Sequence, residues 1–225
     1  MHTLLKSNNK EVIIGIDKPF VMIGEKINPT GIKKLGQALV ERNMEYVKHL
    51  ARRQVDWGAD VLDVNVGHPQ IDEAEIIPMV VEAIKSVVDV PLCIDSNEPR
   101  ILEAGLKVAP GKPLVNSVNG EEKQLASVLP IVKDRGAAVI GLTIADEGIP
   151  PTAEGRLAAA GKIIERAAKM GIPIEDIIID PLVMTVGHDS KAATVTLQTI
   201  ELIKKEFGVN MNLGASNVSF GLPDR

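Results

Sequence analysis

The sequence predicts an α/β protein of the TIM (β/α)8-barrel type, and three observations predict it. Short runs of β-branched residues alternate with longer amphipathic segments from about residue 20 onward, as in repeated βα units around a parallel sheet. Hydrophobic residues make up 45% of the chain and aromatic residues only 2%, so aliphatic side chains must fill the core, as in parallel sheets covered by helices. Polar residues recur where the expected strands end, and in a barrel these ends meet at one rim.

Each expected strand is short and apolar, and most lead into a polar residue or a turn. We expect seven of them, in order at Val21–Glu25, Val61–Val66, Leu92–Asp95, Leu114–Ser117, Ala138–Thr143, Ile177–Asp180 and Met211–Ala215. An open, doubly wound sheet would gather its ligand at one switch point, commonly with a G-x-G-x-x-G motif after the first strand. That motif is absent here, so the barrel is favoured.

The segments between the strands have the period of amphipathic helices. Apolar residues recur about every 3.6 residues from Leu35 to Val55 and from Leu197 to Phe207. Gly208 follows the second of these segments, at the position where a glycine commonly ends a helix. These two segments are therefore predicted helices.

The chain shows no linker, low-complexity segment or short repeat, which predicts one barrel domain at residues 20–225 after an N-terminal lead-in at residues 1–19. A complete barrel needs eight βα units and typically about 250 residues. This chain reaches Arg225 soon after the seventh expected strand. We therefore expect the last βα unit to be missing from it, either by truncation or because another chain supplies the closing strand.

Charge and composition exclude several classes of function. The formal net charge is −5 without a basic run, which argues against a nucleic-acid partner. The single cysteine, Cys93, excludes an intrachain disulfide and a cysteine-cluster metal site. His68 has no second His or Cys at ligand spacing, so no protein-bound metal is expected. No apolar stretch has the length of a signal peptide or membrane span, which predicts a cytoplasmic protein with no membrane association.

Six polar motifs occupy the ends of the expected strands. They are Ile23–Asn28 (IGEKIN), Leu62–Gly67 (LDVNVG), Cys93–Asn97 (CIDSN), Val115–Glu121 (VNSVNGE), Ile179–Leu182 (IDPL) and Ser216–Pro223 (SNVSFGLP). Each motif alone is weak, but together they resemble, in order and spacing, the pterin-binding methyltransferases that serve corrinoid proteins. The resemblance spans about residues 20–225.

This resemblance implies a TIM barrel that binds tetrahydrofolate or 5-methyltetrahydrofolate as its substrate. It also implies a corrinoid protein as partner, which carries the cobalamin, and a homodimer. By this resemblance, Asp95, Asn116 and Asp180 bind the pterin ring, and Asn217 assists methyl transfer. Gly214, Ser216 and Arg225 match positions that line the pterin or p-aminobenzoyl site. Three further strand-end residues, Glu25, Asp63 and Asn65, are added as candidate substrate-binding residues.

The residue types suit this chemistry independently of the resemblance. A pterin presents adjacent donors and acceptors along its amino-pyrimidinone edge, and carboxylates and carboxamides can pair with that edge. The methylated nitrogen is a poor leaving group unless positive charge develops on it. The Asn217 amide could accept a hydrogen bond from that nitrogen when it is protonated, which stabilises charge that is larger in the transition state.

Other interpretations remain open at this point. Asp95 and Asp180 could cap the helices that follow them, Asp63 and Asn65 could fill a polar barrel layer, and Glu25 could form only an exposed ion pair with Lys26. Two alternative functions are a dihydropteroate synthase-like pterin enzyme and a non-catalytic module that binds folate or docks a corrinoid protein. Dihydropteroate synthases carry a Ser-Arg-Lys motif after the seventh strand, where this chain has Ser216-Asn217-Val218.

Overall fold

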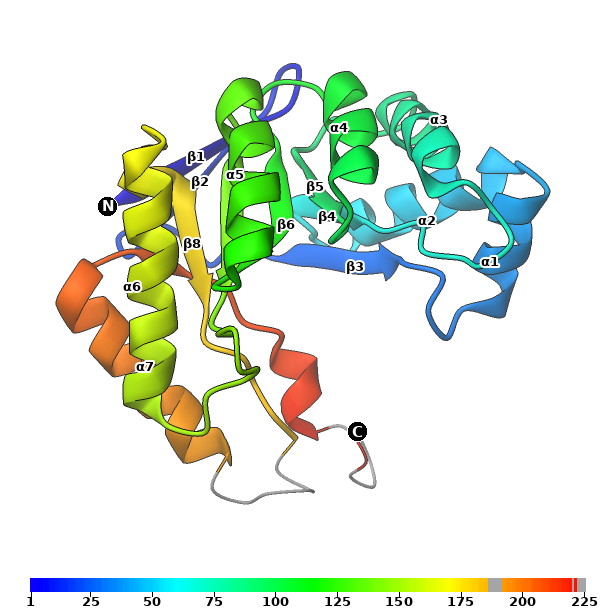
Figure 1. The fold of residues 1–225 in the computed structure, drawn as a ribbon. Helices are drawn as coiled ribbons and strands as arrows, with labels where there is room; N and C mark the ends of the chain where they lie inside the picture. Colours follow the sequence, from blue (N-terminus) through cyan, green and yellow to red (C-terminus); the bar gives the residue numbers. More distant parts are fainter. Residues whose placement is uncertain (186–191, 220, 222–225) are drawn as a thin grey trace. The chain divides into compact units, whose positions relative to one another are not determined.

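The structure is a computed structural model that describes residues 1–185, 192–219 and 221 (Figure 1). Two compact units divide the chain. The N-terminal unit comprises Leu4–Asn116 and Asp134–Ala138, and the C-terminal unit comprises Met1–Thr3, Ser117–Lys133 and Val139–Arg225.

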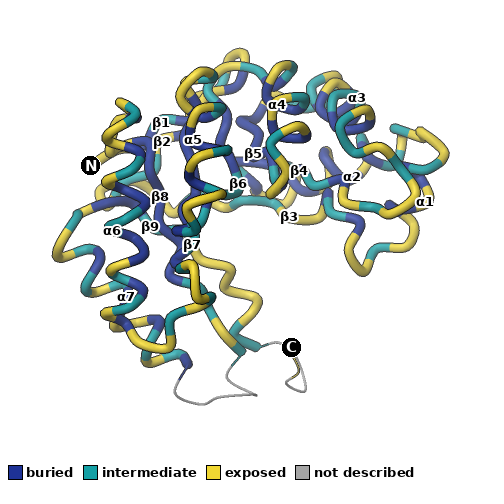
Figure 2. Tube along the Cα trace, viewed as in Figure 1, coloured by how far each residue is buried: buried dark blue, intermediate teal, exposed yellow. Residues whose placement is uncertain are grey.

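The N-terminal unit contains parallel strands that are each followed by one or two helices. Its elements are β3 (Ile23–Ile27), α1 (Lys33–Val40), α2 (Met44–Asp56), β4 (Val61–Val64), α3 (Glu73–Lys85), β5 (Leu92–Asp95), α4 (Pro99–Val108) and the first part of β6 (Leu114–Asn119). The registers Leu62↔Leu92 and Ile94↔Val115 align β4, β5 and β6 in parallel. All four residues of β4 are buried, and Figure 2 shows helices buried along one side and exposed along the other. This is the pattern of a parallel sheet covered by helices.

The segment expected to be one helix from Leu35 to Val55 is two helices, α1 and α2, so that expectation was wrong in detail. The chain turns at Arg42, which has a φ of 54°. Asn43 then begins α2 by accepting a hydrogen bond from the Glu45 N–H through its side chain, as a good N-cap residue does. The apolar period continues across this turn because both helices pack on the same core.

The lead-in forms a two-stranded sheet of β1 (His2–Lys6) and β2 (Glu11–Gly15). The backbone of Lys6 exchanges two 2.9 Å hydrogen bonds with Lys112. Asp89 accepts hydrogen bonds from the Asn8 N–H and the Asn9 side chain at 3.2 and 2.9 Å. These contacts attach the hairpin to the loops before β5 and β6.

The C-terminal unit continues the βα alternation. It contains the last residues of β6, most of α5 (Glu122–Arg135) and β7 (Ala138–Leu142), and then α6 (Ala153–Lys169), the 3-10 helix η1 (Ile174–Asp176), β8 (Ile177–Asp180), α7 (Ala192–Phe207), β9 (Asn210–Met211) and the 3-10 helix η2 (Ala215–Ser219). The unit boundary assigns α5 to this unit as far as Lys133 and β7 from Val139 onward. Strands β7, β8 and β9 are parallel. The predicted helix end at Gly208 is confirmed, with a φ of 65°.

Two expectations in this unit need correction. The last strand was placed at Met211–Ala215, whereas β9 ends at Met211 and Ala215 begins η2. Leu197 was expected on the apolar side of its helix but is 67% exposed. The buried side of α7 carries Ala192, Thr196, Thr199 and Ile203. The two threonines can be buried because their hydroxyl groups donate hydrogen bonds to backbone carbonyls, Thr196 to that of Ala192 and Thr199 to that of Val195.

The sheet order confirms the predicted fold class. Strands β3 to β9 are hydrogen-bonded in the same order as along the chain, and helices follow β3 to β8, which is the topology of a TIM (β/α)8 barrel. The described residues contain seven of its strands. None of the helices in the described residues is long and apolar enough to cross a membrane.

Candidate functional site

Four polar side chains meet at the carboxyl ends of β4, β5 and β6 in the N-terminal unit. Asn116 Nδ2 donates to Asp63 Oδ1 at 3.1 Å, and Asn65 Nδ2 donates to Asp95 Oδ2 at 3.0 Å. We call Asp63, Asn65, Asp95 and Asn116 the strand-end cluster. Period-two alternation places Asp63 and Asn65 on one face of the sheet, and parallel pairing brings the neighbouring strands' side chains beside them.

Burial changes the acidity of the two carboxyl groups. Desolvation, together with the nearby charge of Asp95, raises the pKa of Asp63 to about 7. Burial also raises the pKa of Asp95, while the hydrogen bond from Asn65 acts in the opposite direction. Asp63 is 7% exposed and Asp95 is half-buried, so Asp95 is the more accessible of the two to a ligand.

Cys93 lies beneath the cluster, level with Asp63 in the β4–β5 register. Its thiol is fully buried. Burial and the neighbouring carboxyl groups raise the pKa of this thiol well above its ordinary value. A thiol held in the neutral form is a poor nucleophile, so Cys93 is a core residue, as its place on an apolar strand predicted.

Asp95 and Asp180 differ in whether their side chains cap the backbone that follows them. The N-terminal turn before α4 is closed by Ser96, whose Oγ accepts a hydrogen bond from the Glu98 N–H, and the Asp95 side chain bonds within the cluster instead. Asp180 Oδ1, in contrast, accepts a hydrogen bond from the Leu182 N–H at 2.8 Å and so closes a local turn. Asp95 is therefore free of a capping role.

Asp180 is buried at the end of β8 in the C-terminal unit. Asn212 Nδ2 donates to its Oδ2 at 2.6 Å, and burial raises the pKa of Asp180. The backbone after Asp180 is also fixed, since the buried Arg156 donates from Nη1 to the carbonyls of Pro181 and Leu182 at 2.8 Å each. Sequence reasoning missed both Asn212 and Arg156, because neither stands at a predicted strand end.

The other predicted site residues lie in more open positions. Glu25 is exposed and forms a 2.9 Å ion pair with Lys26, which matches the ion-pair interpretation. Gly214, Ser216 and Asn217 are all exposed, at or beside η2. Arg225 lies outside the described residues, as do Phe220, Leu222 and Pro223 of the last motif.

Comparison with known proteins identifies the family of this chain. The sequence matches the family described as "Pterin binding enzyme" over residues 24–224. This chain belongs to the pterin-binding enzymes.

Curated relatives of this pterin-binding enzyme include methyltransferases. It is 31% identical over 208 residues to the methylcorrinoid:tetrahydrofolate methyltransferase of Eubacterium limosum, covering 91% of this chain and 76% of that protein. It is 30% identical over 217 residues to the methionine synthase of Mycobacterium tuberculosis, covering 92% of this chain but only 18% of that protein. The second match therefore concerns one part of a much longer enzyme.

Solved structures of dihydropteroate synthases share the fold. The Xanthomonas albilineans enzyme, solved with 4-aminobenzoic acid, matches with a TM-score of 0.67 and 20% identity over 94% of this chain and 76% of that one. The Vibrio fischeri enzyme matches with a TM-score of 0.67 and 18% identity over 94% and 77%. At this identity the likeness establishes the fold of the pterin-binding enzyme and no more.

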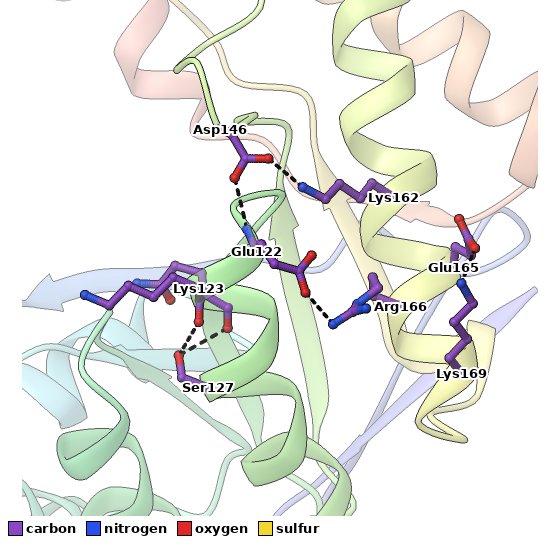
Figure 3. Close-up of polar contacts among 9 residues, drawn as sticks. Glu122, Lys123, Ser127, Asp146, Lys162, Glu165, Arg166 and Lys169 are labelled. Atoms are coloured by element: carbon purple, nitrogen blue, oxygen red, sulfur yellow. Dashed lines mark hydrogen bonds and ion pairs between the residues drawn. The ribbon is translucent and has the colours of Figure 1, made fainter.

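A second feature of the C-terminal unit is a cleft of about 470 Å³ beside the loop that follows β7. Small residues line most of it, with Asp146 and Lys162. Figure 3 shows that these charges are already paired: Lys162 Nζ contacts Asp146 Oδ2 at 2.7 Å, and Asp146 Oδ1 accepts from the Glu122 N–H at 3.1 Å. The cleft contains none of the predicted site residues, and its charges fix the loop to α5 and α6.

Proposed function

We propose that this pterin-binding enzyme transfers a methyl group between a tetrahydrofolate and the cobalt of a separate corrinoid protein. The observation that carries the proposal is the strand-end cluster, in which two carboxyl groups and two carboxamides form two hydrogen-bonded pairs on neighbouring strands. The methyltransferase relative at 31% identity supports the choice among pterin chemistries. The corrinoid supplies the cobalt centre that accepts or donates the methyl group.

The cluster is suited to recognition of an amino-pyrimidinone edge. Asp95 is half-buried, and an ionised carboxylate there accepts hydrogen bonds from ring N–H and amino groups. Asn116 already uses its Nδ2 on Asp63, which orients its Oδ1 as a further acceptor. An analogue without the matching donors would leave these groups unpaired, at a cost of about 1–3 kcal/mol for each buried group.

We also propose the sequence-derived roles of the C-terminal residues. Asp180 would bind the pterin through hydrogen bonds, since its carboxyl group is oriented by Asn212 and the Leu182 N–H. Asn217 would accept a hydrogen bond from the protonated methylated nitrogen and so stabilise charge that develops during transfer. Its exposed position in η2 leaves its amide accessible. The same chemistry permits transfer in either direction.

The direct test is to mix the chain with 5-methyltetrahydrofolate and reduced free cobalamin and to follow the absorption spectrum of methylcobalamin. We expect methylcobalamin to form, and we expect Asp95→Asn to slow its formation by about tenfold or more, since a charge-assisted hydrogen bond is lost. Glu103→Gln is the matched control, because Glu103 is an exposed acid on α4 outside the cluster. Equal rates for both variants would remove Asp95 from the site.

This assay and a separate assay of 7,8-dihydropteroate synthesis distinguish the alternative functions. Retained binding of 5-methyltetrahydrofolate without any spectral change, also with candidate corrinoid proteins, would favour a non-catalytic folate-binding module. Synthesis of 7,8-dihydropteroate would favour the dihydropteroate synthase-like alternative, although the present likeness to those enzymes is one of fold. The homodimer implied by the sequence resemblance stays a prediction, which sedimentation of the purified chain can check.

A further inference from the structure

The Asn65 side chain is held by two hydrogen bonds that fix which way its amide faces. Its Oδ1 accepts from the Gly67 N–H at 2.8 Å, and its Nδ2 donates to Asp95 Oδ2 at 3.0 Å. A backbone N–H can bond only to the oxygen end of a carboxamide, so the contact with Gly67 turns the nitrogen end toward Asp95. Asp95 therefore faces a hydrogen-bond donor and not an acceptor.

The backbone around Asn65 keeps this arrangement in place. Asn65 directly follows β4, and its N–H donates to the Ile27 carbonyl of β3 at 2.9 Å. The turn to Gly67 is tight, since a Cβ built at Gly67 would lie 3.0 Å from Asn65 Oδ1. Asn65 is therefore anchored through both its backbone and its side chain.

The hydrogen bond from Asn65 determines what Asp95 presents to a ligand. It occupies Oδ2 of the carboxyl group, and we therefore assign the ligand contact to Oδ1. A donor that faces Oδ2 favours the ionised carboxylate, which only accepts hydrogen bonds, and restrains its rotation. The Asn116 amide does not take over this role, because its Nδ2 donates to Asp63.

We propose that Asn65 is a positioning residue that holds the Asp95 carboxylate in the orientation in which it accepts hydrogen bonds from the ligand. This inference rests on the proposed pterin site, and it gives Asn65 a role through Asp95 instead of the direct ligand contact expected from the sequence. The amide at position 65 thereby sets the polarity of the site, since a donor there makes the group at position 95 present an acceptor.

Exchanging the donor for an acceptor tests this role. Asn65→Asp keeps an oxygen for the Gly67 N–H but places a second carboxylate oxygen against Asp95 Oδ2, so the two groups repel. Binding of 5-methyltetrahydrofolate is measured by calorimetry at about pH 7.5, and we expect affinity to fall about tenfold or more. Asn43→Asp is the matched control, because Asn43 Oδ1 accepts from the Glu45 N–H in the same way at an exposed helix N-terminus. It should bind like the wild type, and an equal loss in both variants would overturn the proposal.

The double variant Asn65→Asp/Asp95→Asn separates positioning from general damage to the fold. In Asp95→Asn alone, the Asn65 donor attracts the oxygen of the new amide and turns its nitrogen toward the ligand, which gives the site the wrong polarity. In the double variant the carboxylate at position 65 accepts from that nitrogen, so the amide oxygen faces the ligand again. Asn65→Asp should therefore lower affinity in the wild-type background but raise it about tenfold in the Asp95→Asn background. A loss in both backgrounds, or no change in either, would show that Asn65 does not act through Asp95.

Urea unfolding of the same four proteins without ligand keeps this inference separate from the proposed function. The hydrogen bond predicts that Asn65→Asp lowers the urea midpoint in the wild-type background and raises it in the Asp95→Asn background. If this pattern is observed and none of the four proteins binds the folate, the orientation of Asp95 by Asn65 stands and the proposed pterin site fails. If Asn65→Asp shifts the midpoint equally in both backgrounds, Asn65 does not orient Asp95, whatever the proteins bind.

Discussion

At the scale of single residues, two asparagines near the end of the chain differ in environment. Asn212 is half-buried and donates to Asp180 at 2.6 Å. Asn217 is exposed in η2. The first contact contributes to folding, since a buried carboxyl group needs its partner, whereas an exposed amide contributes little to stability. Substitutions at these two positions therefore distinguish the structural role of Asn212 from the role proposed for Asn217 in methyl transfer.

Asn217→Ala should leave stability within about 0.5 kcal/mol of the wild type, because the side chain is exposed. Methyl transfer should slow by about tenfold or more, since one hydrogen bond to the reacting nitrogen is lost. Urea unfolding and the methylcobalamin assay measure the two effects on the same preparation. Unchanged turnover and folate affinity would remove Asn217 from the mechanism.

Asn212→Ala, in contrast, should reduce the stability of the chain. Asp180 Oδ2 loses its 2.6 Å donor, and a buried acceptor left unpaired costs about 1–3 kcal/mol. The free energy of unfolding should fall by that amount, and the pKa of Asp180 should rise further because a hydrogen bond that lowers it is gone. Asn212→Asp is not equivalent, since it places a second carboxyl group beside the first. A neutral effect on stability would show that solvent reaches Asp180 readily.

At the scale of elements, the order and approximate positions of the seven sheet strands in the described residues were predictable, because most are short apolar runs between polar turns, although the last strand is shorter than expected. Periodicity could not predict the break between α1 and α2, since the apolar side continues through Arg42 and Asn43. The lead-in was not expected to form β1 and β2 because its attachments are backbone contacts, such as that between Lys6 and Lys112. Such contacts depend on the tertiary fold rather than on side-chain pattern.

The hairpin attachment depends on Gly111. This residue has a φ of +59°, and a Cβ built there would lie 2.2 Å from Lys6 O. Gly111→Ala must therefore shift the β1 backbone as well as strain its own. Gly136→Ala is the matched control, because Gly136 has a φ of +62° and open space around it.

We expect Gly136→Ala to cost about 1 kcal/mol from the left-handed backbone alone. Gly111→Ala should cost about 2 kcal/mol or more beyond that, since backbone atoms must move. Urea unfolding of the two variants gives the difference. Equal losses would mean that the hairpin is free to move away from Lys112.

At the scale of the whole molecule, the sequence predicted which polar residues lie at the strand ends better than it predicted their hydrogen-bond partners. Asp63, Asn65, Asp95 and Asn116 were each marked by a strand end, and the structure brings these four together. The partner of Asp180 was missed because Asn212 lies just beyond a strand of only two residues, Asn210–Met211. The raised pKa of Asp63 was likewise beyond sequence reasoning, since it depends on depth of burial and not on residue type.

The buried carboxyl groups also set how the stability of the chain depends on pH. The pKa values of Asp63, Asp95 and Asp180 are raised by burial, so near pH 5 to 6 the folded chain holds protons that the unfolded chain has released. Stability must then decrease as pH rises through this range toward about 7, the folded pKa of Asp63. Exposed acids with lowered pKa values, such as Asp72 and Glu45, have the opposite effect, since they increase stability as pH rises. This increase is finished by about pH 5, and salt screens the ion pairs that cause it.

Unfolding in urea at about pH 5.5, 6.5, 7.5 and 8.5, in the presence of about 0.5 M salt to screen surface pairs, measures this dependence directly. We expect the wild type to lose stability from about pH 5.5 to 7.5 with little further loss by about 8.5, and Asp63→Asn to lose distinctly less, because the amide cannot ionise. The lowered pKa values of Asp72 and Glu45 cannot produce this trend, since their effect has the opposite sign. Stability that stays constant or rises from about pH 5.5 to 8.5 would show that Asp63 ionises in the folded chain as readily as in the unfolded one.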